Sequence, residues 1–382
     1  MKVKILSMQK VINYGSFMQA YALKKIIESY GHNVEFCDFK SGSSRHRGEK
    51  VTPITKLEKL KKLPSYIISP KSYVSKKIFN RKKLKCFHKT IWPLLNIDDN
   101  VNLDYKSDLF VIGSDEVFNY TQNHAFGYVP AFFGYDNNSN VIISYAASAG
   151  YTDILDIEKD GMIEEIKIGF RNFDMISVRD QNTYEIVKHF TNKVPTMVLD
   201  PTLLYDFTEH NYDEPDIAKN GKYLLVYAYT DRLDSKEDIK LVKSYAKKRG
   251  LKIVSAGFFH EWCDYNLVLK PFELLSLFKY AEGVITDTFH GTIFSIINKR
   301  PFLSLLRYQN KRGSNSNKLK FLLKQLGLES RVYNNKDDFE IQLNKSIQYD
   351  KVDNCLEELR KTSNQYLSDS LSLAMTAIRE RV

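Results

Sequence analysis

The chain has 382 residues, of which 43% are hydrophobic and 27% charged, and its net charge is +10. This composition is typical of a soluble globular protein and the length predicts two domains, which excludes a largely disordered chain. We expect a cytoplasmic protein, because the first residues lack a signal-peptide pattern and no run reaches about 18 apolar residues. The four cysteines lie far apart and predict neither a disulfide framework nor a metal site.

The positive charge is concentrated in one segment. Residues 56–89 contain twelve Lys or Arg and one acid, Glu58, so the segment carries +11 and the remaining residues together carry −1. One interpretation is a solvated helical face in an insertion spanning 50–90. The other is an amphipathic element that rests on an anionic membrane or receives an anionic acceptor. Nucleic acid is not an expected partner, because no groove-reading or RNA-binding motif accompanies the segment.

The first forty residues predict one βαβ unit, whose two strands are parallel. A strand at 3–8 is followed by a turn at 13–16. A helix is expected over 17–30, where apolar residues recur at helical spacing, and a second strand at 34–39. Beyond the basic segment, the chain predicts further strands at 108–113, 141–148, 175–179 and 196–200.

A second alternating series follows a polar stretch at 211–222, which we interpret as an interdomain linker. Its expected strands are 223–229, 252–257, 283–287 and 301–306, and its expected helices are 236–249, 272–281 and 290–299, with a helical tail over 352–379. The predicted fold class is α/β, with two doubly wound Rossmann-like domains that face a cleft. The N-terminal domain is predicted to span 1–210, the C-terminal domain 218–345 and a C-terminal helix 350–382.

Ligands of doubly wound sheets bind beyond the carboxyl ends of the strands, and this rule selects the candidate site residues. They are Asn13, Tyr14, Gly15, Ser16, Gly113, Ser114, Asp115, Glu116, Ser148, Arg179, Asp180, Asp200, Pro201, Asp287, Thr288 and His290. Structural roles compete at several of these positions. Asn13, Ser16 and Asp115 can cap helices. Arg179 and Asp180 can form a surface ion pair, and the stretch from Asp200 to Thr202 can open a turn.

His290 stands at the expected start of a helix, directly beyond a strand. The N–H groups and dipole of a helix N-terminus attract anions, and Gly291 would let a ligand approach the backbone. The sequence has no GxGxxG after its first strand and no GxxxxGK[ST], which disfavours a Rossmann dehydrogenase and a P-loop enzyme. It also has no GxSxG elbow.

Seven pieces of sequence stand at these junctions in order. They are NYGSFMQAYAL (13–23), VIGSDEVFN (111–119), ISYAAS (143–148), ISVRD (176–180), VLDPTLL (198–204), TDTFHGTIFSIINKRPF (286–302) and KLKFLLKQLGLESR (318–331). Together they resemble the polysaccharide pyruvyl transferase family. The resemblance implies a glycosyltransferase-B-like pair of domains. It implies phosphoenolpyruvate as donor, and as product a pyruvate ketal on a sugar of a cell-surface glycan precursor, such as that of an exopolysaccharide.

The resemblance also implies roles for single residues. The donor, on the C-terminal domain side, would contact Arg179, Thr288, His290, Gly291 and Lys318. His290 would hold the phosphate or protonate the enol carbon, and Asp115 or Asp287 would act as the general base. The acceptor, a sugar or lipid-linked oligosaccharide on the N-terminal side, would contact Asn13, Tyr14, Gly15 and Ser148. No metal and no cofactor is expected.

Two positions depart from the family's pattern. Some members carry an arginine where this chain has Thr288, and others carry one where it has Lys318. We expect the missing cation to come from Arg307, Arg312 or Lys318. Two other functions stay open: a glycosyltransferase of the same fold that uses a nucleotide sugar, and a non-catalytic member that binds sugar or serves as a scaffold.

Overall fold

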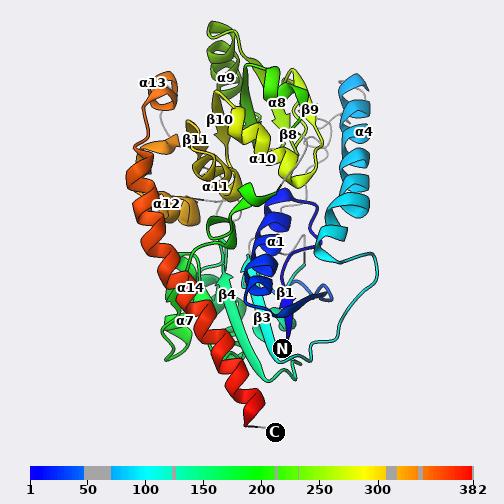
Figure 1. Cartoon of the computed structure of the whole chain (residues 1–382), viewed down its shortest axis with the longest axis vertical. Coiled ribbons are helices and arrows are strands. Elements are labelled where there is room, and N and C mark those ends of the chain that lie inside the picture. Colours follow the sequence, from blue (N-terminus) through cyan, green and yellow to red (C-terminus); the bar gives the residue numbers. More distant parts are fainter. Residues whose placement is uncertain are drawn as a thin grey trace.

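Two parallel six-stranded sheets form the framework of the chain, one above the other in Figure 1. The structure is a computed structural model, and it describes residues 1–46, 70–122, 126–210, 214–230, 232–306, 316–333 and 339–380. Residues 56–69 of the basic segment, Arg307 and Arg312 lie outside the described residues.

The first sheet contains β1 (Lys2–Leu6), β2 (Asn33–Cys37), β3 (Leu109–Asp115), β4 (Val141–Ala147), β5 (Ser177–Val178) and β6 (Thr196–Met197). Its order is β2-β1-β3-β4-β5-β6, and every neighbouring pair is parallel. The chain runs outwards from β1 to β2 and then crosses to the other side of β1 to form β3. The strand order therefore reverses between β1 and β3.

The second sheet repeats this plan. It contains β7 (Tyr223–Tyr227), β8 (Lys252–Ala256), β9 (Tyr265–Leu267), β10 (Gly283–Thr286), β11 (Phe302–Leu305) and β12 (Val332–Tyr333). Its order is β12-β11-β10-β7-β8-β9, again with every pair parallel. Here the strand order reverses between β7 and β10.

Helices connect and cover the strands. They are α1 (Tyr14–Ser29), α4 (Pro70–Cys86), α5 (Ile154–Asp160), α6 (Ile163–Arg171), α7 (Gln181–Phe190), α8 (Asp216–Asn220), α9 (Lys236–Lys248), α10 (Pro271–Tyr280), α11 (Phe289–Ile297), α12 (Ser316–Gln325), α13 (Phe339–Asn344) and α14 (Tyr349–Arg379). None of the helices among the described residues has both the length and the apolar character needed to cross a membrane.

Both faces of each sheet are buried. Successive strand residues point to opposite faces, and on both faces they join apolar clusters. In β7, Leu225 belongs to an apolar cluster that both sheets share, whereas Leu224 belongs to a cluster on the far face of the second sheet. In β3, Val111 joins the shared cluster and Ile112 joins a cluster on the far face of the first sheet. The prediction of two doubly wound, Rossmann-like α/β domains is therefore confirmed.

The bounds of several elements differ from the predicted ones for local reasons. α1 begins at Tyr14 and not at Phe17, because Asn13 Oδ1 accepts the N–H groups of Gly15 and Ser16 and starts the helix inside the expected turn. Residues 216–220 of the expected linker form α8. The sequence analysis does not predict two short edge strands, β9 with three residues and β12 with two.

The long helix α14 joins the two halves of the molecule, running from the second sheet down past the first (Figure 1). Near its start, the Tyr349 hydroxyl donates to the carbonyl of Arg300, which precedes β11 (2.7 Å). Farther along, the Tyr366 hydroxyl donates to the carbonyl of Ser144 in β4 (2.8 Å). One helix thus holds both sheets in a fixed relation.

Candidate functional site

The two points at which the strand order reverses lie against each other. Asn13, which follows β1, donates from Nδ2 to the hydroxyl of Tyr229, which follows β7 (2.9 Å). Gly15, in the first turn of α1, lies against the ring of His290 in α11. Ligands of doubly wound sheets bind at such reversal points. The fold therefore brings the candidate residues of both sheets to one place.

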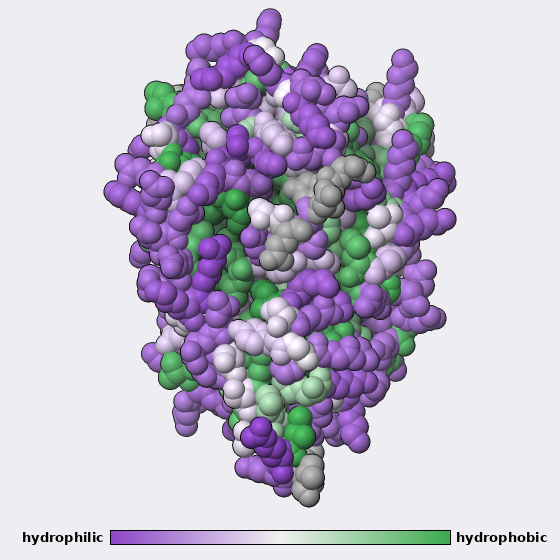
Figure 2. All heavy atoms as spheres, in the orientation of Figure 1, coloured by the Kyte–Doolittle hydropathy of each residue, from purple (hydrophilic) through white to green (hydrophobic). Residues whose placement is uncertain are grey.

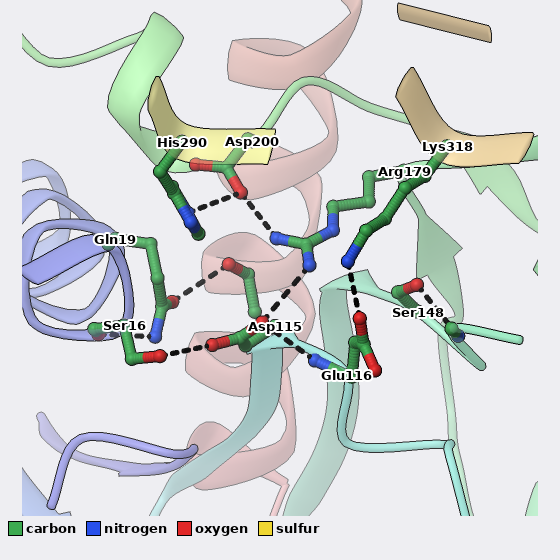
Figure 3. Close-up of polar contacts among 12 residues, drawn as sticks. Ser16, Gln19, Asp115, Glu116, Ser148, Arg179, Asp200, His290 and Lys318 are labelled. Atoms are coloured by element: carbon green, nitrogen blue, oxygen red, sulfur yellow. Dashed lines mark hydrogen bonds and ion pairs between the residues drawn. The ribbon is translucent and has the colours of Figure 1, made fainter. Parts of the chain in front are cut away.

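Arg179 is the centre of the polar network drawn in Figure 3. It directly follows β5, and its side chain is only 2% exposed. Its Nη1 donates to Asp200 Oδ2 (2.5 Å), and its Nη2 donates to Asp115 Oδ1 (3.1 Å). Asp180 is not its partner, because that carboxylate caps α7 by accepting the N–H of Thr183 (2.9 Å). Arg179 and Asp180 are both buried, so the alternative of a surface ion pair is wrong.

Asp200 has two tasks in the structure. Its Oδ1 accepts the backbone N–H and the hydroxyl of Thr202 (3.0 and 2.6 Å), as expected of a turn opener. Its Oδ2 faces Arg179 and also lies 3.6 Å from Nε2 of His290. Burial alone would raise the pKa of Asp200, but His290, Arg179 and Thr202 together hold that pKa well below its usual range. An ionised carboxylate therefore links a histidine of one domain to an arginine of the other.

The His290 ring fits between Asp200 and Gly15. A Cβ atom on Gly15 would lie 2.3 Å from His290 Nδ1, so no larger residue fits at position 15 without moving the ring. Nε2 is buried and, among the described residues, has no hydrogen-bond partner, because 3.6 Å to Asp200 exceeds hydrogen-bond distance. Gly15 is thus packed against His290, and its expected contact with the acceptor stays a prediction.

Lys318 reaches the same site from α12. Its ammonium donates to Glu116 Oε1, and it lies over the ring of Phe289, 5.6 Å from the centroid. The guanidinium of Arg179 also lies over this ring, at 4.7 Å. Both cations therefore lie over the ring of Phe289, the residue before His290. Lys318, one of three candidates for the missing cation, does stand at the site.

Asp115 ends β3 with a backbone φ of 79°. Residues other than glycine are uncommon in this region and concentrate at functional sites. Its Oδ2 accepts from the hydroxyl of Ser16 (2.8 Å), and its Oδ1 accepts the N–H of Glu116 (3.0 Å) as well as Arg179. Behind it, Gln19 donates to the carbonyl of Ser16 (2.8 Å). Three donors thus hold Asp115, namely the Ser16 hydroxyl, the Glu116 N–H and Arg179, and Asp115 does not cap a helix.

The start of α11 corrects two expectations. Thr288 is the N-cap, and its Oγ1 accepts the N–H of Gly291 (2.9 Å), so neither group is free for a donor. A Cβ atom on Gly291 would lie 2.2 Å from Thr286 Oγ1 and 2.7 Å from the Tyr227 ring. Gly291 is therefore required for close packing of α11 on β10 and β7, rather than for the approach of a ligand.

Asp287 is also placed differently from the expectation that it is a base. Its side chain is fully buried, and its Oδ1 accepts the backbone N–H of Tyr229 (2.9 Å). Its Oδ2 lies 3.9 Å from Nη1 of Arg232. The carboxylate thus ties the end of β10 to the loop after β7. We therefore retain Asp115, and not Asp287, as the candidate base.

The remaining acceptor candidates have structural partners. The Tyr14 ring is 1% exposed, and its hydroxyl donates to the carbonyl of Leu269 (2.6 Å), so it joins the two domains and offers no surface to a sugar. Ser148 is buried, and its hydroxyl accepts the N–H of Gly150 (3.0 Å). Asn13 caps α1 and reaches Tyr229. The acceptor contacts of these residues stay predictions.

Four site residues are not in the predicted catalytic and binding sets: Ser16, Glu116, Asp200 and Phe289. The rule of strand ends does point to the first three. It does not rank them, because a capping serine or aspartate has the same local sequence as a catalytic one. Phe289 carries no polar group, and only the structure reveals that two cations share its ring.

Within the described residues, no cluster of three or more His, Cys, Asp or Glu side chains has the arrangement of a metal site. What the site does offer is two permanent cations and a histidine among three carboxylates, nearly all of it buried. Such a site can bind a compact anion and can move a proton. The fold and the site together define a two-domain α/β protein in which cationic, acidic and histidine side chains gather between the domains.

Residues 13–310 match the family model described as polysaccharide pyruvyl transferase, and the chain belongs to this family of transferases. No curated protein matches the sequence. Among solved structures, a putative UDP-N-acetylglucosamine 2-epimerase from Listeria monocytogenes is 11% identical, with 97% of each chain covered and a TM-score of 0.48. The glycosyltransferase SnogD from Streptomyces nogalater is 11% identical, with 99% of each chain covered and a TM-score of 0.46.

Proposed function

We propose that the protein transfers the pyruvyl group of phosphoenolpyruvate to a sugar of a cell-surface glycan precursor and forms a pyruvate ketal. One observation carries the proposal. In a chain of the pyruvyl transferase family, Arg179, Lys318 and His290 converge on the ring and helix start at Phe289, although they come from three separate elements. Phosphoenolpyruvate carries a phosphate and a carboxylate, and it requires cations of this kind.

The residues divide between donor and acceptor as follows. Arg179 and Lys318 bind the anionic groups of the donor, and His290 adds a third positive group when it is protonated. Asp200 keeps Arg179 and His290 in position from the buried side. Asp115 faces the first turn of α1 through Ser16 and is the base for an acceptor hydroxyl on that side.

The reaction balances with these groups once Asp115 has returned its proton to His290 through solvent. One acceptor hydroxyl gives its proton to Asp115 and adds through oxygen to the central carbon of the donor. The methylene carbon gains a proton from His290 and becomes a methyl group. The second hydroxyl then adds to the central carbon, and the bond between this carbon and the phosphate oxygen breaks. The phosphate leaves with the proton of the second hydroxyl. Arg179 and Lys318 stabilise the charge that grows on the leaving phosphate.

We further propose that α4 brings the enzyme to the cytoplasmic face of an anionic membrane, where a lipid-linked acceptor is located. Seven of the 17 residues of α4 are Lys or Arg and none is acidic. Four large apolar residues on it are 41–52% exposed, namely Tyr73, Val74, Ile78 and Leu84. Figure 2 shows hydrophobic atoms among hydrophilic ones along the edge where α4 runs. Interleaved cations and apolar side chains on one helix suit an anionic lipid surface.

The decisive experiment is mass spectrometry of candidate sugar acceptors after incubation with the full-length protein and phosphoenolpyruvate. We expect a product that is heavier by one pyruvyl ketal group, with one phosphate released for each product formed. Protection of the protein by a nucleoside diphosphate, without protection by phosphoenolpyruvate, would instead indicate a glycosyltransferase. Glycan binding without any donor binding would indicate a non-catalytic member.

A further inference from the structure

Both permanent cations of the site already have carboxylate partners. The two pairs differ in accessibility. The side chains of Arg179 and Asp200 are 2% and 0% exposed, whereas those of Lys318 and Glu116 are 15% and 21% exposed. An incoming anion therefore meets the Lys318–Glu116 pair first. Exchange at the buried pair would leave the Asp200 carboxylate without its cation and without solvent, which is costly.

The Lys318–Glu116 pair also connects the two domains. Glu116 follows β3 of the first sheet, and Lys318 is on α12, beside the second sheet. The other oxygen of Glu116 accepts from Asn119 Nδ2 (2.8 Å), so the carboxylate has a second anchor on its own domain if it leaves Lys318. In Figure 3 the Lys318 side chain extends alongside Arg179 and ends at Glu116.

The charges of the site make this exchange necessary. Burial alone would raise the pKa of Glu116, but Lys318, Asn119 and Arg179 lower it to about 2, so Glu116 is ionised at neutral pH. Asp115, Glu116 and Asp200 then supply three negative charges against the two permanent positive charges of Arg179 and Lys318. A donor with further negative charges needs a cation that is released from its present partner.

We propose that Glu116 is an internal competitor of the anionic donor: it occupies Lys318 in the empty site and yields Lys318 to an anionic group of the donor on binding. The identity of that donor rests on the proposed function, but the exchange itself does not. Glu116 thereby sets the negative charge that a ligand needs in order to bind Lys318. A phosphate that carries two negative charges displaces it, whereas neutral and singly charged ligands do not.

The test compares Glu116→Gln with Glu116→Asp in the full-length protein. Gln keeps an acceptor for Lys318 and Asn119 but loses the charge, and Asp keeps the charge. Calorimetry would measure the Kd for phosphoenolpyruvate and for inorganic phosphate. We expect Glu116→Gln to bind both about tenfold more tightly than the wild type, which equals about 1.4 kcal/mol, and Glu116→Asp to remain close to the wild type. In kinetics, Glu116→Gln should lower KM for the donor without raising kcat.

Two controls isolate the pair. In a Lys318→Met background the Glu116→Gln change should no longer tighten binding. Glu164→Gln, which removes a charge from an exposed residue of α6 (side chain 71% exposed), should leave both Kd values unchanged. Equal or weaker binding by Glu116→Gln, in a variant that melts like the wild type, would overturn the inference.

The inference and the proposed function can fail separately. If the wild type transfers pyruvate and Glu116→Gln does not tighten phosphate binding, only the inference falls. If Glu116→Gln tightens phosphate binding but the wild type makes no ketal from phosphoenolpyruvate, the exchange stands and the proposed donor is wrong.

Discussion

The imidazole of His290 rests directly against the backbone of Gly15, so that a Cβ atom at position 15 would lie 2.3 Å from Nδ1. Gly15 belongs to the first turn of α1 in one domain, and His290 belongs to α11 in the other. The first turn of one helix is thus a wall that fixes the ring on the other. On the opposite side, Asp200 limits the ring at 3.6 Å from Nε2.

Gly15→Ala tests the importance of this wall. We expect turnover to fall by about 10², because a displacement of about 1 Å at a reacting group has effects of that size. The melting temperature should change little, because alanine favours the helix by about 1 kcal/mol over glycine and offsets part of the clash. Steady-state kinetics and a thermal melt check both. Full activity in Gly15→Ala would show that the ring tolerates displacement.

His290→Ala and Arg179→Lys test the donor site itself. We expect each to lower turnover by about 10² or more, since each removes a group that stabilises the charge of the transition state. Lysine keeps the charge of Arg179 but cannot contact Asp115 and Asp200 with a planar fork. Arg179→Ala would in addition destabilise the fold by about 3–5 kcal/mol, because it leaves buried Asp200 unpaired. If His290→Ala and Arg179→Lys both kept near-normal turnover, the donor assignment would be wrong.

Asp200→Asn separates positioning from capping. Asparagine can still cap Thr202, but it removes the charge that holds Arg179 and His290, so we expect about a 10² loss of turnover. Its effect should appear mainly in kcat, because the groups that Asp200 positions are proposed to act on the reacting atoms.

The chain offers a matched control for that change. The Asp206 carboxylate accepts the N–H and the hydroxyl of Thr208 (2.8 and 2.7 Å), in the same way as Asp200 accepts those of Thr202. Both hydrogen bonds of Asp206 are exposed. Asp206→Asn should leave turnover unchanged. An equal loss in both variants would mean that Asp200 matters only as a cap.

The framework of the fold was predictable because buried parallel strands are continuous apolar runs that end in polar residues. β3 and β7 show this pattern plainly. The partners of the site were less predictable. One oxygen of Asp200 opens a turn, and this local role explains the residue without any long-range partner. The sequence therefore does not indicate that the other oxygen accepts from Arg179, which follows a separate strand. A sequence shows which residues follow the strands. Which of these residues contact one another depends on the order of the strands in each sheet and on the contact between the domains.

Lys83 of α4 gives the fold a dependence on pH. Its ammonium lies over the rings of Phe258, Phe87 and Tyr14 at 5.0, 5.9 and 5.9 Å, and burial lowers its pKa from 10.5 to about 8. Between these two values the unfolded chain binds more protons than the folded one, so this residue makes stability rise with pH from about 8 to 10.5. Below that window both states hold the proton, and the full cost of the buried charge remains.

We therefore expect Lys83→Met to raise the melting temperature at pH 7, because burial of the charge costs more than its attraction to the rings returns. The difference from the wild type should shrink as the pH rises through the window. Thermal melts at intervals from pH 7 to 10 would measure it. A lower melting temperature for Lys83→Met at pH 7 would mean that the aromatic contacts dominate.

The proposed membrane contact makes a last prediction about α4. Replacing Lys76, Lys77, Lys82 and Lys85 by glutamine should weaken binding to vesicles of equal parts phosphatidylcholine and phosphatidylglycerol by about 10² or more, since each lysine near such a surface contributes about 1 kcal/mol. Lys83 is left in place because aromatic rings hold it. Cosedimentation would measure binding, which should also weaken as salt is added.

The matched control removes four lysines from α9 instead, at positions 236, 240, 243 and 247, and leaves the net charge the same as in the α4 variant. We expect this control to bind the vesicles like the wild type and both variants to retain turnover on a soluble acceptor. Equal weakening in both variants would show that only total charge matters. Unchanged binding in the α4 variant would leave α4 as a solvated helical face, because its charges would then have no anionic partner at the membrane.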